Sequence, residues 1–235
     1  MSRFLAVLGL ALLCITASQA GLTVSFVNAT QVTGSTYQYN YSLTLASNDE
    51  LNPPTIVGAQ CLTGAGTGAC VNTTFATIYD IPNLVVNGTT PSVGGNVGWG
   101  VATQFIGVTP VTSGGGPVNP PNGDSASLEN VTFYYTGATV YCGGTGFGCI
   151  GTQQSVFNGF SLQVTGATGA VTVGSYTSSV TNAQFYSVGV TGINAVDYAS
   201  GSLLIPSIVT PEPATIALLG LGLVGLGFAG KKLRR

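Results

Sequence analysis

The side chains that could do chemistry in this chain are mostly carboxylates. Between Gly21 and Thr210 there is no lysine, arginine or histidine. The acidic residues of that stretch are Asp49, Glu50, Asp80, Asp124, Glu129 and Asp197. Serine triads, cysteine–histidine pairs and Schiff-base chemistry therefore lack a base or a nucleophile. A pair of carboxylates about 5 to 10 Å apart, as in glycoside hydrolases, is the remaining route to catalysis.

Two pairs of carboxylates lie close together in the sequence. Asp49 is adjacent to Glu50, and Asp124 lies five residues before Glu129. Both pairs lie in stretches rich in proline, asparagine and serine, where solvated turns are the ordinary structure. We therefore expect no catalytic residue and no enzyme, and a secreted carboxylate-dependent hydrolase is the least favoured alternative.

The loop from Asn119 to Glu129 offers several oxygen ligands, and extracellular modules often bind calcium weakly. Asp124 and Glu129 are the candidate ligands, but their spacing does not match an EF-hand. A plain surface turn is the favoured interpretation. The sequence therefore predicts no bound metal and no cofactor, with calcium as an alternative.

Charge is distributed unevenly along the chain. The stretch from Gly21 to Thr210, called the body here, has six carboxylates and no cation, so its net charge is −6. All basic residues lie near the ends, as Arg3, Lys231, Lys232, Arg234 and Arg235. A body without cations cannot neutralise phosphates, which excludes nucleic acid as a partner.

The body shows the pattern of strand after strand. Apolar residues from Tyr37 to Leu45 alternate with polar ones, a period of two that buries one face of a strand. Shorter strand signals cover 22–27, 55–59, 75–81, 97–108, 131–135, 157–164, 170–176, 183–190 and 201–205. This spacing predicts one antiparallel β-sandwich domain over residues 21–209, either immunoglobulin-like or jelly-roll-like. The stretch from Pro110 to Ser127 is either a long loop of that domain or a linker between two smaller ones.

Four cysteines lie within the body, in two glycine-rich stretches. They are Cys61, Cys70, Cys142 and Cys149. An even number of cysteines in an exported chain predicts disulfides. Local pairing, Cys61 with Cys70 and Cys142 with Cys149, is favoured, because glycines let short rings close. The other two pairings stay open, and a zinc site is disfavoured by the wide spacing.

Residues 1–20 have the pattern of a secretory signal peptide. Arg3 supplies a positive start, and an apolar run from Phe4 to Ile15 follows. Ser18 and Ala20 place small residues at positions −3 and −1 of a cleavage site. We predict cleavage by signal peptidase between Ala20 and Gly21.

The C-terminal segment, residues 210–235, differs in composition from the body. Pro211, Glu212 and Pro213 precede a run of 17 residues, 214–230, in which Thr215 is the one polar side chain. As a helix, this run would extend about 26 Å, the short end of the range for a membrane span. The basic cluster Lys231, Lys232, Arg234 and Arg235 follows, which places that end in the cytoplasm and the body outside.

This tripeptide, the glycine- and leucine-rich span and the basic cluster together resemble the PEP-CTERM sorting domain. The resemblance covers about 25 residues and leaves the family of the body unknown. It implies recognition by an exosortase, a membrane-embedded protease resembling a transpeptidase, which cuts near the tripeptide. It also implies a membrane-anchored intermediate and then a cell-surface or extracellular destination, in bacteria that make exopolysaccharide and biofilm.

Taken together, these features predict an exported, non-enzymatic protein with a structural role in an exopolysaccharide or biofilm matrix. The first alternative is an extracellular carbohydrate-binding module, with or without calcium. Trp99 and the tyrosines could stack on sugar rings if they were exposed, although their alternation with polar residues favours packing inside the fold.

Overall fold

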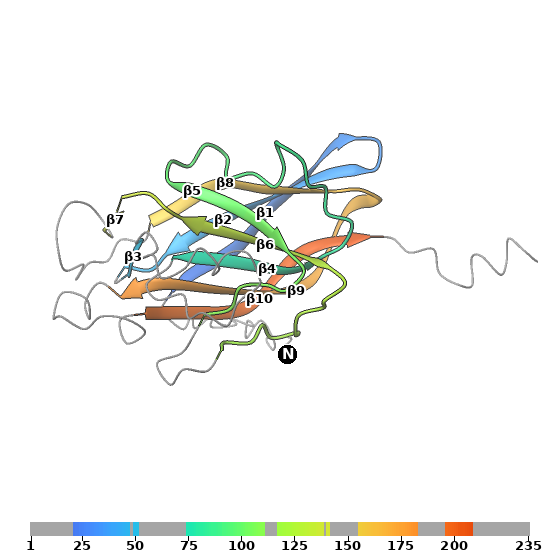
Figure 1. The fold of residues 1–235 in the computed structure, drawn as a ribbon. Coiled ribbons are helices and arrows are strands. Elements are labelled where there is room, and N and C mark those ends of the chain that lie inside the picture. The colour runs from blue at the N-terminus through green and yellow to red at the C-terminus, as the bar shows by residue number, and fades with distance from the viewer. Residues whose placement is uncertain are drawn as a thin grey trace, which may run out of the picture.

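The computed structural model describes residues 21–47, 49–51, 74–110, 117–138, 140–141, 155–182 and 196–208. Within these residues the chain is all-β, with antiparallel strand pairing throughout (Figure 1). None of the described segments forms a helix long and apolar enough to cross a membrane. The predicted all-β antiparallel class is confirmed for this part of the chain.

The strands form two sheets. The smaller sheet has the order β1–β2–β8, with β1 at Leu22–Thr33, β2 at Thr36–Leu45 and β8 at Ser155–Val164. The larger sheet begins with β5 (Trp99–Gln104), β6 (Glu129–Tyr135) and β4 (Phe75–Ile81). It continues through β9 (Ala167–Asn182), β3 (Asp49–Leu51) and β7 (Val140–Tyr141), and β10 (Val196–Ile208) pairs with β9.

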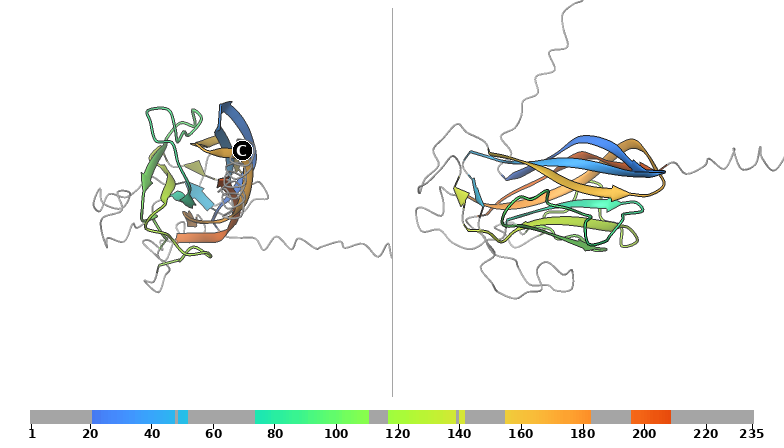
Figure 2. Two further views of the ribbon diagram at one scale, coloured as in Figure 1. Left: turned by 90° about the vertical axis from the view of Figure 1, so that its right-hand side faces the viewer. Right: turned by 90° about the horizontal axis from the view of Figure 1, so that it is seen from above.

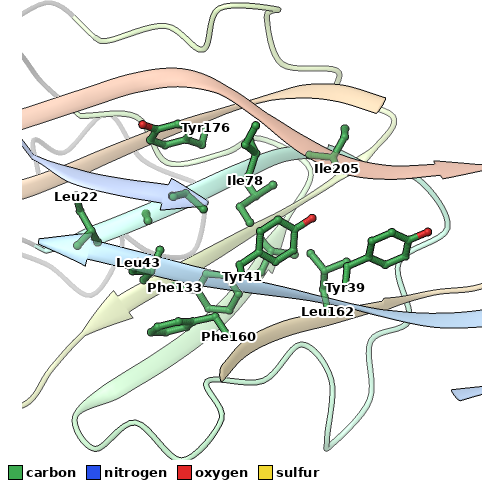
Figure 3. Close-up of a cluster of buried hydrophobic side chains, with 14 of the residues drawn as sticks. Leu22, Tyr39, Tyr41, Leu43, Ile78, Phe133, Phe160, Leu162, Tyr176 and Ile205 are labelled. Carbon is green, nitrogen blue, oxygen red and sulfur yellow. The ribbon is translucent and has the colours of Figure 1, made fainter. Parts of the chain in front are cut away.

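The view from above shows β1, β2 and β8 on one side of the body and the green strands β4, β5 and β6 of the larger sheet on the other (Figure 2). One core of buried side chains is shared by β1, β2 and β8 on one side and β4, β6, β9 and β10 on the other. Figure 3 shows Tyr39, Tyr41 and Leu43 of β2 among the buried side chains of other strands, such as Ile78, Phe133 and Ile205. Burying apolar surface between two layers is the main force that holds such a fold together.

Strand β2 shows how the sequence pattern produces this packing. Tyr39, Tyr41, Leu43 and Leu45 are all completely buried, as the alternation predicts. The Tyr39 hydroxyl donates to the carbonyl of Ala170 at 3.1 Å, and the Tyr41 hydroxyl donates to that of Leu204 at 3.2 Å. Each tyrosine therefore buries its ring in the core and satisfies its hydroxyl on the opposite sheet.

Strand β4 is buried along most of its length, because it lies inside the larger sheet and the segment near Val108 covers it. The hydroxyls of Thr77 and Tyr79 both donate to the carbonyl of Val108, at 2.9 and 2.8 Å. Tyr79 also contacts the Thr177 hydroxyl at 2.8 Å. Burial raises the pKa of Tyr79, so its phenol stays protonated and keeps these bonds.

Most of the predicted strands are found, with different ends. Residues 75–81 form β4 as predicted, and β1, β9 and β10 extend several residues beyond the ranges 22–27, 170–176 and 201–205. The predicted strands at 55–59 and 183–190 lie outside the described residues. The short strands β3 and β7 were not predicted, because three and two residues give no readable alternation.

Candidate functional site

The loop carboxylate Asp124 belongs to a polar cluster at the end of β4. Asp80 adopts a positive φ of 59° there, and the register between β4 and β6 shifts between Ile78 and Ile81. The Asp80 backbone N–H donates to Oδ1 of Asn130 at 2.8 Å, and Oδ1 of Asp80 accepts from the Ser125 N–H at 2.8 Å. This β-bulge therefore turns Asp80 toward the loop that carries Asp124.

Both carboxylate oxygens of Asp124 already have donors. Oδ2 accepts from the Gly107 N–H at 2.8 Å, and Oδ1 accepts from Nδ2 of Asn130 at 2.9 Å. Glu129 lies at the start of β6, where it pairs with Ile81. Among the described residues no group of three or more metal-binding side chains gathers, here or elsewhere. These hydrogen bonds hold the loop that carries Asp124 against β4 and β6. The oxygens of Asp124 accept from N–H groups, at the positions where a bound cation would need them free.

Asn130 is the centre of this cluster and is completely buried. Replacing it with alanine would leave the Asp80 N–H and the Phe105 carbonyl without the partner they have now. We expect Asn130→Ala to lower the free energy of unfolding by about 2 to 4 kcal/mol, since each buried unpaired group costs about 1 to 3 kcal/mol. Asp124→Ala removes the acceptor of the exposed Gly107 N–H, while Nδ2 of Asn130 keeps its bond to the Phe105 carbonyl, so its cost should be smaller.

Denaturant unfolding of the two variants would measure the difference, and hydrogen exchange of the Asp80 amide would locate it. The amide should exchange much faster in Asn130→Ala than in Asp124→Ala. Equal exchange in both variants would show that Asn130 does not hold the bulge.

A second acidic site lies where β1 begins. Asp49 and Glu50 were expected in a solvated turn, and this expectation is wrong: they form β3, with exposed fractions of 0% and 2%. Oδ2 of Asp49 accepts a hydrogen bond from the backbone nitrogen of Gly21 at 2.7 Å. The short strand is held by pairing with both β9 and β7, which draws its side chains into the interior.

Asp197, at the start of β10, is the charged neighbour of Asp49. Burial, and then repulsion and hydrogen bonding with Asp197, raise the pKa of Asp49. Within the described part of the chain, Oδ1 of Asp49 has no hydrogen-bond donor. This pair could not be predicted from the sequence, because 148 positions separate the two residues along the chain.

The aromatic side chains that could have stacked on sugars are mainly part of the core. Trp99 is only 8% exposed and packs against the rings of Tyr135, Phe157 and Phe160, with centroids 5.4, 5.8 and 5.1 Å away. Among the tyrosines whose side chains the structure describes, Tyr198 on β10 is the most exposed, at 42%. Trp99 therefore serves packing between the sheets and offers no free face for a sugar ring.

Most other predicted site residues lie outside the described part of the chain. These are Ala20, the four cysteines Cys61, Cys70, Cys142 and Cys149, the tripeptide Pro211, Glu212 and Pro213, and the basic cluster Lys231, Lys232, Arg234 and Arg235. The disulfides and the membrane span at 214–230 therefore stay predictions. Gly21 is described, and it is the residue that contacts Asp49.

Comparison with known proteins identifies the C-terminal segment. Residues 209–235 match the family model of the PEP-CTERM protein-sorting motif. The body has no counterpart in that match, and neither a curated protein nor a solved structure matches the chain. The chain thus carries the sorting signal of an exported protein that passes through a membrane-anchored stage and is processed by an exosortase.

Proposed function

We propose that this chain is a cell-surface or extracellular-matrix protein whose body has a structural role in an exopolysaccharide or biofilm matrix. The match of residues 209–235 to the PEP-CTERM protein-sorting motif is the observation that carries the proposal. In this proposal a signal peptide starts export and the apolar span 214–230 holds the intermediate in the membrane. Exosortase processing then releases the body from the membrane. The body is a β-sandwich in which Cys61, Cys70, Cys142 and Cys149 form disulfides.

The arrangement of the carboxylates supports a non-enzymatic body. Asp124 has both oxygens engaged by N–H donors, and Asp80 accepts from a backbone N–H. Asp49 is buried in β3, away from substrate-sized molecules in solvent. A general acid must present a dissociable proton to a bound substrate, and a catalytic base must present a free lone pair. Each of these three carboxylates instead accepts hydrogen bonds from groups of the protein itself.

The structural role predicts a specific result in a strain that lacks the gene. Such a strain should make a normal amount of exopolysaccharide but a less cohesive matrix, because the missing part is a structural component. A gene that carries Glu129→Gln should restore cohesion as well as the natural gene does. The substitution removes a carboxylate that a hydrolase or a calcium site at Asp124 and Glu129 would need.

Three other results would contradict the structural role. One is release of soluble sugars from a polysaccharide panel by the purified protein, lost in Glu129→Gln. Another is failure of Glu129→Gln to restore cohesion while the variant is exported normally. The third is saturable binding of oligosaccharides, with or without calcium, which would favour the carbohydrate-binding alternative.

A further inference from the structure

The contact between Gly21 and Asp49 joins the predicted signal cleavage site to the interior of the fold. Gly21 is buried immediately before β1, at the end of the body where β3 lies and β10 begins (left in Figure 1). Its nitrogen lies 2.7 Å from Oδ2 of Asp49, a side chain with no exposed surface. Cleavage between Ala20 and Gly21 would convert this amide nitrogen into a terminal amine, and the nitrogen would still belong to Gly21.

Among the residues that the structure describes, none brings a positive charge to Asp49. The nearest acidic groups are Asp197 on β10 and Glu50, the next residue of β3, whose side chain points to the opposite face of the strand. Tyr176 on β9 bonds to the Thr23 side chain and the Val24 backbone of β1, and burial raises its pKa, so it stays neutral. No described residue donates a hydrogen bond to Oδ1 of Asp49. No lysine, arginine or histidine between Gly21 and Thr210 can supply one.

The position next to Asp49 also accepts only a residue without a side chain. A Cβ added to Gly21 would lie 2.9 Å from the backbone nitrogen of Ala199 and 2.9 Å from the carbonyl carbon of Tyr198. Both are backbone atoms of β10, which cannot move aside as the end of a side chain can. Glycine at this position therefore lets the chain start fit closely between β3 and β10.

We propose that the α-ammonium group created at Gly21 by signal cleavage forms a buried ion pair with Asp49, so that cleavage completes the fold of the body. Hydrolysis adds one water across the Ala20–Gly21 bond, which leaves a carboxylate on Ala20 and a protonated amine on Gly21. The amine stays where the peptide nitrogen was, and it can donate to Asp49 with the charge that the site lacks. Asp197 is half-buried and interacts with Asp49, so it adds negative charge to the same site.

Before cleavage, Asp49 should make the folded chain less stable as the pH rises. Burial and Asp197 hold the pKa of Asp49 above its ordinary value of about 3.9, so the folded chain keeps a proton that the unfolded chain loses. Stability from this site is therefore greatest below the unfolded pKa and falls as the pH rises toward the folded pKa. Within that window the unfolding equilibrium constant should rise about tenfold per pH unit.

After cleavage the direction changes. The ammonium group lowers the pKa of Asp49, and the carboxylate raises the pKa of the amine above its ordinary value of about 7.7 to 8.0. The ion pair then stabilises the fold above the unfolded pKa of Asp49. That contribution is lost as the pH falls through the lowered pKa of Asp49, and it is lost again as the pH rises through the raised pKa of the amine.

The test compares three forms of the chain in the same detergent. The first is residues 21–235 with a free Gly21 amine, and the second is residues 18–235. The third is residues 21–235 acetylated on the Gly21 amine while unfolded and then refolded, which removes the charge without adding residues. From pH 5 to pH 7, the unfolding constants of the second and third forms should rise by about a hundredfold, which is tenfold per unit. The constant of the first form should stay nearly level.

Two further measurements make the test independent of any single variant. Asp49→Asn should remove the difference between the first and third forms, and Asp197→Asn should reduce it if Asp49→Asn does not fold. In the folded first form, the Gly21 amine should react with an acylating reagent much more slowly than in the unfolded chain.

Equal pH dependence in all three forms, or an amine that reacts equally fast in the folded chain, would overturn the ion pair. The inference depends on the predicted cleavage after Ala20, but none of these measurements involves sorting or the matrix. Its failure would therefore leave the proposed function standing.

Discussion

Replacing Phe160 with alanine should lower the free energy of unfolding by about 3 to 5 kcal/mol. Phe160 lies on β8 with no exposed surface, and its ring contacts Trp99 and Phe133 of the other sheet at centroid distances of 5.1 and 5.0 Å. The change removes buried apolar surface, leaves a cavity between the layers, and ends two edge-to-face contacts, each worth about 0.5 to 1.5 kcal/mol. Because this is the point where both sheets share aromatic rings, the loss should affect the whole fold.

Denaturant unfolding would measure this loss through the fluorescence of Trp99, the one tryptophan of the chain, and through circular dichroism. Phe105→Ala is the matched control, because the Phe105 side chain is 55% exposed and its removal leaves no buried cavity. The control should change stability by no more than about 0.5 kcal/mol. A loss below about 1 kcal/mol for Phe160→Ala would mean that the sheets do not depend on this contact.

Changing Pro211, Glu212 and Pro213 together to alanine should abolish processing and keep the protein in the membrane fraction. The tripeptide opens the segment that matches the PEP-CTERM protein-sorting motif, and an exosortase that does not recognise it leaves the apolar span and basic cluster attached. An apolar span of this length, once inserted, is not extracted under mild conditions. Cell fractionation and immunoblotting would show the loss of released protein.

Thr215→Val is the matched control for the tail. It removes the one polar side chain of the span 214–230 and leaves the tripeptide and the basic cluster in place. Processing of this variant should be normal. If the alanine variant were released as efficiently as the control, the tripeptide would not be the recognition element.

The strand pattern of the body could be predicted well where alternation is long. The polar and apolar alternation from Tyr37 to Leu45 predicts β2 and the residues of it that are buried, because side chains of a strand alternate between its faces. The same reasoning fails for β3, whose residues Asp49 to Leu51 are too few to alternate and include two acids. Its burial depends on pairing with β9, a contact between residues more than 130 positions apart in the sequence.

The candidate sites divide in a similar way. The sorting motif is local in sequence, and its prediction is confirmed by the family match at residues 209–235. The role of Asp124 could not be predicted, since its donors come from Gly107 and Asn130 on other segments. Asp49 was expected in a solvated turn but is buried. Because the body has no lysine, arginine or histidine, the amine of a new chain terminus is the kind of cation that could pair with such a buried acid.

The intact mass of the protein released from the cell surface would show whether both ends of the chain are removed during export and sorting. We expect a chain that begins at Gly21 and lacks Lys231 to Arg235, because signal peptidase and exosortase have each removed one end. A released chain that still ends at Arg235 would contradict exosortase processing. A released chain that begins before Gly21 would contradict cleavage after Ala20.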